Sequence, residues 1–177
     1  MEKLRKEVKE RFDRADMEYC GFRWYFKEHV ATVEKESEKL CEKYGGDAEV
    51  VKAAALLHDI GLIGKGREGH VKRSVERGKK LLDKHGFNEE FQEKVAEIIK
   101  QEKDSKEAKI LDTADALGHL KSMHFFGKAA ITQDLEEFRE WGLEKLDNDL
   151  NRIAFEDEKD EAEQIAEVLR EQLSYSR

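Results

Sequence analysis

Apolar residues recur every three or four positions along most of this chain, which is the spacing of an amphipathic α-helix. No segment alternates apolar and polar residues as a half-buried strand does, and proline is absent from the 177 residues. Glu, Lys, Ala and Leu, which all favour helix, are abundant. We therefore predict an all-α fold, built as a single compact bundle of several helices.

Breaks in this pattern set the expected helices, because glycines and N-capping residues separate successive helical segments. The segment 48–59 differs from the others, since Val50, Val51 and the Ala-Leu run at 53–57 leave it little polar surface. We expect this segment to be buried. The expected helices span residues 1–19, 26–43, 48–59, 69–85, 89–102, 106–125, a segment after Thr132, and 157–173.

Charge is abundant and unevenly distributed. Charged residues make up 42% of the chain, and the formal net charge is −8. Residues 132–177 hold 15 acidic and 6 basic side chains, so the acidity lies in the C-terminal part. An acidic chain disfavours broad nucleic-acid binding, because phosphate backbones attract basic surfaces. We expect the whole chain, 1–177, to be one domain in which acidic helices at about 132–175 pack on the rest or form a contact in a homo-oligomer.

Two features bear on location in the cell. Cys20 and Cys41 have neither the spacing of a metal site nor the number of a disulfide framework, which is typical of thiols in a reducing compartment. No apolar run is long enough to cross a membrane, and the first residues lack the apolar segment of a signal peptide. We expect a cytoplasmic protein with no membrane partner.

Candidate chemistry lies in histidines and aspartates on different helices. His58 and Asp59 end the buried segment, and Gly61 follows two residues later. An acid at a helix C-terminus faces the negative end of the macrodipole, so Asp59 needs a compensating cation. His29 lies upstream in an amphipathic helix, and Asp115 lies downstream in an apolar one. Two imidazoles and two carboxylates from three helices can hold one divalent metal ion.

These residues, in this order, resemble the HD-domain superfamily of metal-dependent phosphohydrolases. The resemblance covers about residues 22–125 and includes the aromatic approach to the first histidine, the helix end at 55–61 and an Ala-Asp pair at 114–115. It implies one divalent ion (Mn, Fe, Co, Ni, Mg or Zn) and hydrolysis of phosphate esters by metal-activated water. The implied substrate is a small phosphorylated molecule, often a nucleotide. The implied metal ligands are His29, His58, Asp59 and Asp115.

Two departures from the family pattern refine this expectation. In relatives that bind two metals, further histidines follow the His-Asp pair; His70 matches the first, but Gln101 stands where a second is expected. We therefore expect one metal ion. In HD-type deoxynucleotide monophosphatases a glutamate soon after the pair acts as acid or base, and Leu62 stands there in this chain. General acid–base work then falls to His70 or to metal-bound water, unless His70 is simply an exposed residue at a helix start.

Basic residues in the glycine-rich loop at 61–69 are candidates for substrate binding. Lys65 and Arg67 can hold a phosphate, for which the planar guanidinium is well suited, or they are solvated loop residues. Asp112, close to Asp115 on the same helix, is a reserve ligand. We expect His119 to pack or to bind a neighbouring side chain.

The sequence thus predicts a metal-dependent hydrolase of phosphate esters. Two alternatives stay open. One is a module that binds metal and nucleotide without catalysis, which the residues at positions 62 and 101 favour. The other is a structural helical protein whose acidic face recruits a protein partner.

Overall fold

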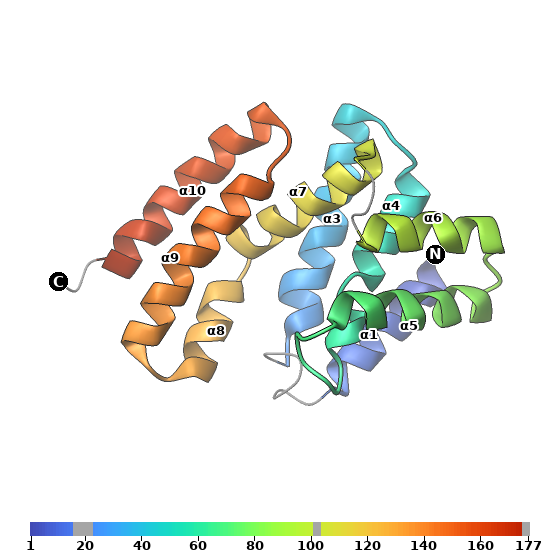
Figure 1. Cartoon of the computed structure of the whole chain (residues 1–177), viewed down its shortest axis with the longest axis horizontal. Coiled ribbons are helices and arrows are strands. Elements are labelled where there is room, and N and C mark those ends of the chain that lie inside the picture. The colour runs from blue at the N-terminus through green and yellow to red at the C-terminus, as the bar shows by residue number, and fades with distance from the viewer. Residues whose placement is uncertain (16–22, 101–103, 175–177) are drawn as a thin grey trace.

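The computed structural model describes residues 1–15, 23–100 and 104–174, and these ranges contain helices and no strands. The all-α prediction is therefore confirmed (Figure 1). Cys20 and Gln101, used above, lie outside the described residues. The α-helices are α1 (Glu2–Asp13), α3 (Ala31–Tyr44), α4 (Ala48–Leu57), α5 (His70–Lys84), α6 (Glu89–Lys100), α7 (Lys106–Leu120), α8 (His124–Thr132), α9 (Leu135–Arg152) and α10 (Glu156–Ser174). A π-helix, η1 (Phe26–Val30), precedes α3, and a 3-10 turn, η2 (Ile60–Leu62), follows α4.

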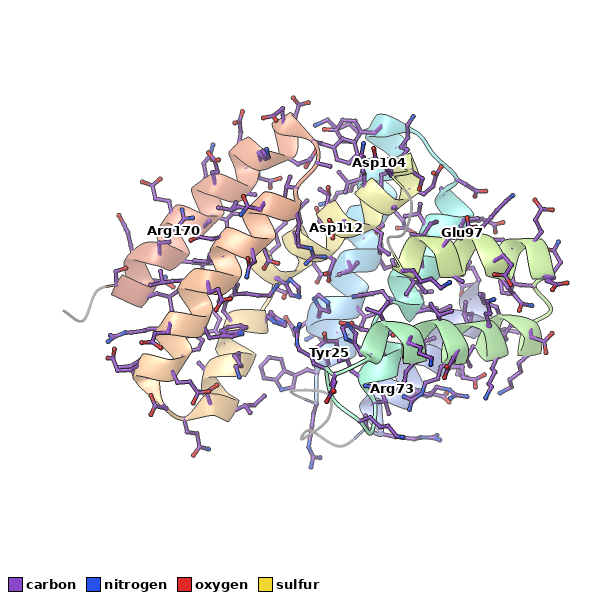
Figure 2. The ribbon with its side chains drawn as sticks, viewed as in Figure 1. Tyr25, Arg73, Glu97, Asp104, Asp112 and Arg170 are labelled. Atoms are coloured by element: carbon purple, nitrogen blue, oxygen red, sulfur yellow. The ribbon has the colours of Figure 1, made fainter. Side chains whose placement is uncertain are left out.

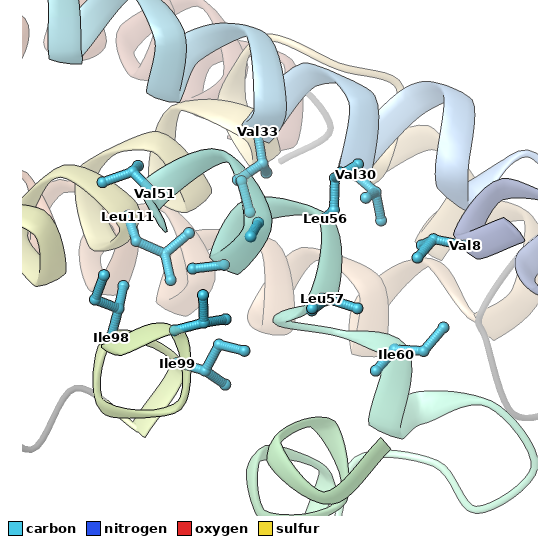
Figure 3. Packing of buried hydrophobic residues seen from close by; sticks show 14 of the residues in the cluster. Val8, Val30, Val33, Val51, Leu56, Leu57, Ile60, Ile98, Ile99 and Leu111 are labelled. Atoms are coloured by element: carbon cyan, nitrogen blue, oxygen red, sulfur yellow. The ribbon is translucent and has the colours of Figure 1, made fainter. Parts of the chain in front are cut away.

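The centre of the first apolar cluster is α4, which packs against α3, α6 and α7. As the sequence predicts, this helix is buried, because Ala, Val and Leu occupy nearly all of its faces. Figure 3 shows Val51, Leu56 and Leu57 surrounded by apolar side chains of the neighbouring elements, among them Val33 and Ile99. The C-terminus of α4 is consequently fixed from several sides, and the His58-Asp59 pair lies at that end.

A second apolar cluster joins the C-terminal helices to α7. Leu117 of α7, Leu146 of α9 and Ala166 of α10 are all fully buried in it. In Figure 1, α9 lies between α7 and α10, and it also contacts α8. Ala114 belongs to the first cluster and Ala116 to the second. Asp115 therefore stands where α7 passes from one cluster to the other.

Two predicted helix boundaries are wrong. The segment 106–125 is two helices, because α7 ends at Leu120 and α8 begins at His124. The hydroxyl of Ser122 accepts a bond from the His124 backbone N–H at 3.3 Å, a local bond that competes with helix continuation. The helix expected over 1–19 ends at Asp13, and a backbone bond from Ala15 to Phe12 closes a turn there. Residues 16–19 lie outside the described ranges.

The outer faces of the helices carry charged side chains, for example Arg170, which is labelled in Figure 2. Ion pairs join different elements; for example, Lys43 of α3 contacts both Asp157 and Glu158 of α10. Exposed pairs of this kind contribute only about 0–1 kcal/mol each, so apolar packing holds the bundle together. None of the described helices is long and apolar enough to span a membrane.

Candidate metal centre

Three elements bring the four predicted ligands together: η1 carries His29, the end of α4 carries His58 and Asp59, and α7 carries Asp115. Adjacent residues of a regular helix point about 100° apart. The backbone leaves the helical conformation at Asp59, which has φ −110° and ψ 5° before the 3-10 turn. This irregular turn lets His58 and Asp59 point toward the same place. A π-helix at His29 is a second local irregularity, and such widened turns are frequent at functional sites.

The loop after the His-Asp pair is held tightly against α5. A Cβ on Gly61 would stand 2.1 Å from the carbonyl oxygen of His70, so only glycine allows this approach. The Gly61 backbone N–H donates to the Ser74 hydroxyl at 2.9 Å. Arg73 donates to the Gly61 carbonyl at 2.9 Å, and Arg77 donates to the carbonyls of residues 60 and 63. These bonds fix the backbone just beyond Asp59.

Ligand atoms of the four residues converge. His29 Nε2 lies 3.0 Å from Asp115 Oδ1 and 3.3 Å from His58 Nε2. Asp59 Oδ2 lies 3.5 Å from His29 Nε2 and 3.3 Å from His58 Nε2. His58 Nε2 lies 3.4 Å from Asp115 Oδ1. Two ligands that are each about 2.1 Å from one ion stand roughly 3–3.5 Å apart, so these separations fit a shared divalent cation.

Hydrogen bonding around the cluster also fits a metal site. Asp115 Oδ1 is buried and accepts no hydrogen bond from the described residues, whereas its Oδ2 accepts from Arg152 Nη2 at 2.6 Å. His58 Nδ1 donates to the Ala55 carbonyl at 2.8 Å, which leaves the Nε2 lone pair directed at the cluster. Nothing described fixes the tautomer of His29, whose Nδ1 is buried without a hydrogen-bond partner. An unsatisfied carboxylate oxygen and an oriented imidazole are typical of metal ligands.

Asp59 is oriented by two further groups. The hydroxyl of Tyr25, itself buried, donates to Asp59 Oδ2 at 2.5 Å. His70 donates from Nδ1 to the Arg67 carbonyl at 2.7 Å, and its Nε2 lies 3.5 Å from Asp59 Oδ1. Each carboxylate oxygen of Asp59 therefore has a defined neighbour. Such outer contacts orient a ligand and keep it ionised.

The electrostatics of the cluster favour ionised carboxylates. Burial raises the pKa of Asp59, but His58 and His29 together outweigh burial and hold the pKa well below its usual value. Burial likewise raises the pKa of Asp115, but His119, Arg152, His29 and His58 together hold this pKa well below its usual value. Burial lowers the pKa of His58, but Asp59 and Asp115 raise it well above its usual value. A divalent ion and a proton would compete for Nε2 of His58, because the carboxylates of Asp59 and Asp115 attract both.

A pocket of about 240 Å³ opens over the cluster. Besides His58, Asp59 and Asp115, four cationic side chains line it: Arg67, Lys100, Lys145 and Arg152. The local surplus of cations in a chain of net charge −8 suits an anionic ligand. A larger hollow, about 530 Å³, runs along α1 among exposed charged residues and contains none of the predicted site residues.

The remaining predicted site residues differ in their positions. Arg67 and His70 line the pocket, whereas Lys65 is exposed in the loop and is not among the lining residues. Asp112, on the same helix as Asp115, accepts a hydrogen bond from Arg152 Nε at 2.7 Å. His119 is buried next to the cluster, with its Nε2 3.8 Å from Asp115 Oδ1.

Sequence reasoning missed two residues of α9. Arg152 bonds Asp115, and Lys145 lies against His119, with Nζ 2.9 Å from Nδ1. One signal could have found them: Lys145, Asp149 and Arg152 follow each other at spacings of four and three, so they form a polar stripe on one face of a helix.

Comparisons with known proteins bear on the family and the fold. A family model described as HD domain matches residues 26–129, which is more than half of the chain. Among solved structures, the crystal structure of Bacillus subtilis YpgQ in complex with ADP is similar in fold, with a TM-score of 0.67 and 22% sequence identity. That similarity covers 98% of this chain and 92% of YpgQ. No curated protein matches the chain. The matched family model, the helical fold and the order of the histidine and aspartate residues show that this chain belongs to the HD-domain family.

Proposed function

We propose that this protein is a metal-dependent hydrolase of phosphate esters that acts on a small phosphorylated molecule such as a nucleotide. HD-domain proteins are generally metal-dependent phosphohydrolases, which supports the reaction class. YpgQ, which shares the fold, binds ADP, and this supports a nucleotide as the ligand. The observation that carries the proposal is a cluster below a pocket lined by cations. Ligand atoms of His29, His58 and Asp115 lie within 4.8 Å of one another, and Asp59 Oδ2 lies 3.5 Å and 3.3 Å from the two histidine Nε2 atoms.

The four converging residues would hold one divalent ion. Such an ion supplies a Lewis acid and an activated water for attack on phosphorus. The chain's own part is to hold the phosphoryl group and to exclude other water. Arg67, at the pocket edge, can donate two parallel hydrogen bonds to phosphoryl oxygens.

His70 is the residue best placed to move a proton. Its Nδ1 is committed to the Arg67 carbonyl, so Nε2 is the atom that exchanges a proton. That atom lies 3.5 Å from Asp59 Oδ1, and the side chain is 24% exposed at the pocket. We assign it the proton transfer to or from the substrate oxygen.

Metal content and phosphate release test the proposal together. Wild-type protein reconstituted with Mn²⁺ should hold about one ion per chain and release phosphate from nucleotides or generic esters. His58→Ala and Asp59→Ala should lose both properties, because each removes a ligand. The matched control is His85→Ala, since His85 caps the end of α5 opposite to His70 and bonds Glu7 of α1. Equal metal content in all four proteins would refute the ligand assignment.

One observation favours a second function, nucleotide binding without catalysis. Leu62, at the position where some relatives have a catalytic glutamate, is buried in the first apolar cluster. It therefore offers no acid or base to the pocket. Thermal stabilisation by a nucleotide, with no phosphate released under any divalent metal, would select this function.

A further inference from the structure

We infer that Lys145 of α9 is an anion subsite, where its ammonium group binds a phosphoryl oxygen beside the metal ligands. The residue lies outside the matched HD region, which ends at residue 129. The identity of the anion rests on the proposed function, but its binding can be measured without turnover.

Lys145 is held so that one donor is left for the pocket. Its side chain is 13% exposed and lines the pocket with Asp115 and Arg152. Nζ lies 2.5 Å from Asp149 Oδ1 and 2.9 Å from His119 Nδ1. An ammonium group has three N–H donors, and these two contacts use two of them. Among the residues that the structure describes, no third acceptor contacts Nζ, so the third donor can bind a ligand in the pocket.

The chemistry of these groups identifies Lys145 as the donor of the cluster. A charged ammonium has N–H donors and no acceptor, so His119 Nδ1, at 2.9 Å, and Asp149 Oδ1 both accept from Nζ. The 3.2 Å contact between His119 Nδ1 and Asp149 Oδ1 then joins two acceptors. Asp149 is fully buried, and its contact with Nζ fixes the position of the ammonium group.

Packing alone does not account for a lysine at this position. A buried ion pair stabilises a fold no better than apolar residues of similar volume, and Leu146 next to it already fills the apolar cluster. A cation close to Asp115 also opposes binding of a metal ion there. An anion that binds between the metal ion and Lys145 removes this conflict.

Helix α9 and the loop that carries Arg67 approach the pocket from different parts of the fold. In Figure 1, α9 lies on one side of α7, while α5 and α6 lie on the other. Arg67 and Lys145 both line the pocket. A phosphoryl group over the metal ligands would thus be held between two cations from elements far apart in the sequence.

Calorimetric titration with inorganic phosphate tests the subsite, in metal-free and in Mn²⁺-loaded protein. Lys145→Met should weaken phosphate binding by about 10- to 100-fold, which is the effect of losing one hydrogen bond to a charged group. Lys145→Arg should retain most of the affinity. Lys159→Met is the matched control, because it removes a positive charge from exposed α10 and should change nothing. The Mn²⁺ affinity of every variant should be within about threefold of the wild-type affinity, or higher than it.

A second variant guards against misfolding. Lys145→Met leaves Asp149 buried without its cation, so Lys145→Met/Asp149→Asn, which removes both charges, is measured beside it. Unchanged phosphate affinity in either folded variant would overturn the inference. So would a parallel loss of Mn²⁺ and phosphate affinity, which would show that Lys145 supports the metal ligands instead.

The inference and the proposed function fail in different ways. Wild-type protein that binds Mn²⁺ and phosphate through Lys145 but hydrolyses no ester would refute the hydrolase and leave the subsite standing. Ester hydrolysis with the same KM in wild type and Lys145→Met would refute the subsite and leave the hydrolase standing.

Discussion

Arg152 Nη2 donates to Asp115 Oδ2 at 2.6 Å, while the other oxygen of the same carboxylate lies 3.0 Å from His29 Nε2. The guanidinium also bonds Asp112, so it is fixed by two carboxylates of one helix. Arg152 thereby determines which oxygen of Asp115 faces the candidate metal centre. Arg152, the last residue of α9, thus orients the predicted metal ligand Asp115 of α7.

Replacement of Arg152 should weaken metal binding without removing any ligand. Loss of an outer contact of this kind typically lowers metal affinity about 10- to 100-fold, and we expect this range for Arg152→Met. Mn²⁺ titration calorimetry measures the change. Arg170→Met is the control, because Arg170 pairs with Asp147 on the exposed surface. Equal Mn²⁺ affinity in wild type and Arg152→Met would show that Asp115 needs no such support.

Tyr25→Phe isolates the hydrogen bond to Asp59. The phenyl ring can keep its stacking on Phe12, whose ring centroid is 5.6 Å away, so the melting temperature should change little. Mn²⁺ affinity should fall about tenfold, because a hydrogen bond that orients a charged ligand is lost. A large drop in melting temperature with normal metal affinity would assign Tyr25 a packing role instead.

Gly61→Ala should be one of the most destabilising single changes in the site. The added Cβ would stand 2.1 Å from the His70 carbonyl oxygen and 2.6 Å from the Ser74 backbone nitrogen. Overpacking of this kind lowers the free energy of unfolding by about 1–3 kcal/mol or more. Urea denaturation measures it. The control is Gly78→Ala in α5, where φ is not positive and an added Cβ meets only the Leu57 side chain, at 3.4 Å. It should lower the free energy of unfolding less, and an equal loss would contradict the packing argument.

Glu7 should make the stability of the protein sensitive to acid. Bonds from Lys84 and Arg11 lower the pKa of Glu7 from 4.5 to about 2. Since the pKa is lower in the folded state, the contribution is complete above pH 4.5 and is lost as the pH falls toward 2. The Glu7 side chain is 19% exposed, but its partners Arg11 and Lys84 are 47% and 62% exposed, so solvent screens the pairs and the contribution is about 0–1 kcal/mol. Glu7→Gln should lose this part of the acid dependence in urea denaturation at a series of pH values, and an unchanged dependence would contradict it.

Local pattern was sufficient to predict the helical class, the burial of α4 and the position of His58 and Asp59 at the end of that helix. These features depend on residues close in the sequence. The end of α7 at Leu120 was not predicted, because Phe125 continues the apolar spacing and only Ser122 indicates the turn. The contacts of Lys145 and Arg152 depend on how α9 packs on α7, which no local pattern specifies.

Anomalous scattering from crystals of the Mn²⁺-loaded protein tests the central claim most directly. The account predicts one manganese peak, bounded by His29 Nε2, His58 Nε2 and oxygens of Asp59 and Asp115, each at about 2–2.5 Å. A peak among His29, His119 and His124, whose nitrogens also lie within 4.8 Å of one another, would contradict it. So would a saturated crystal without any manganese beside His58.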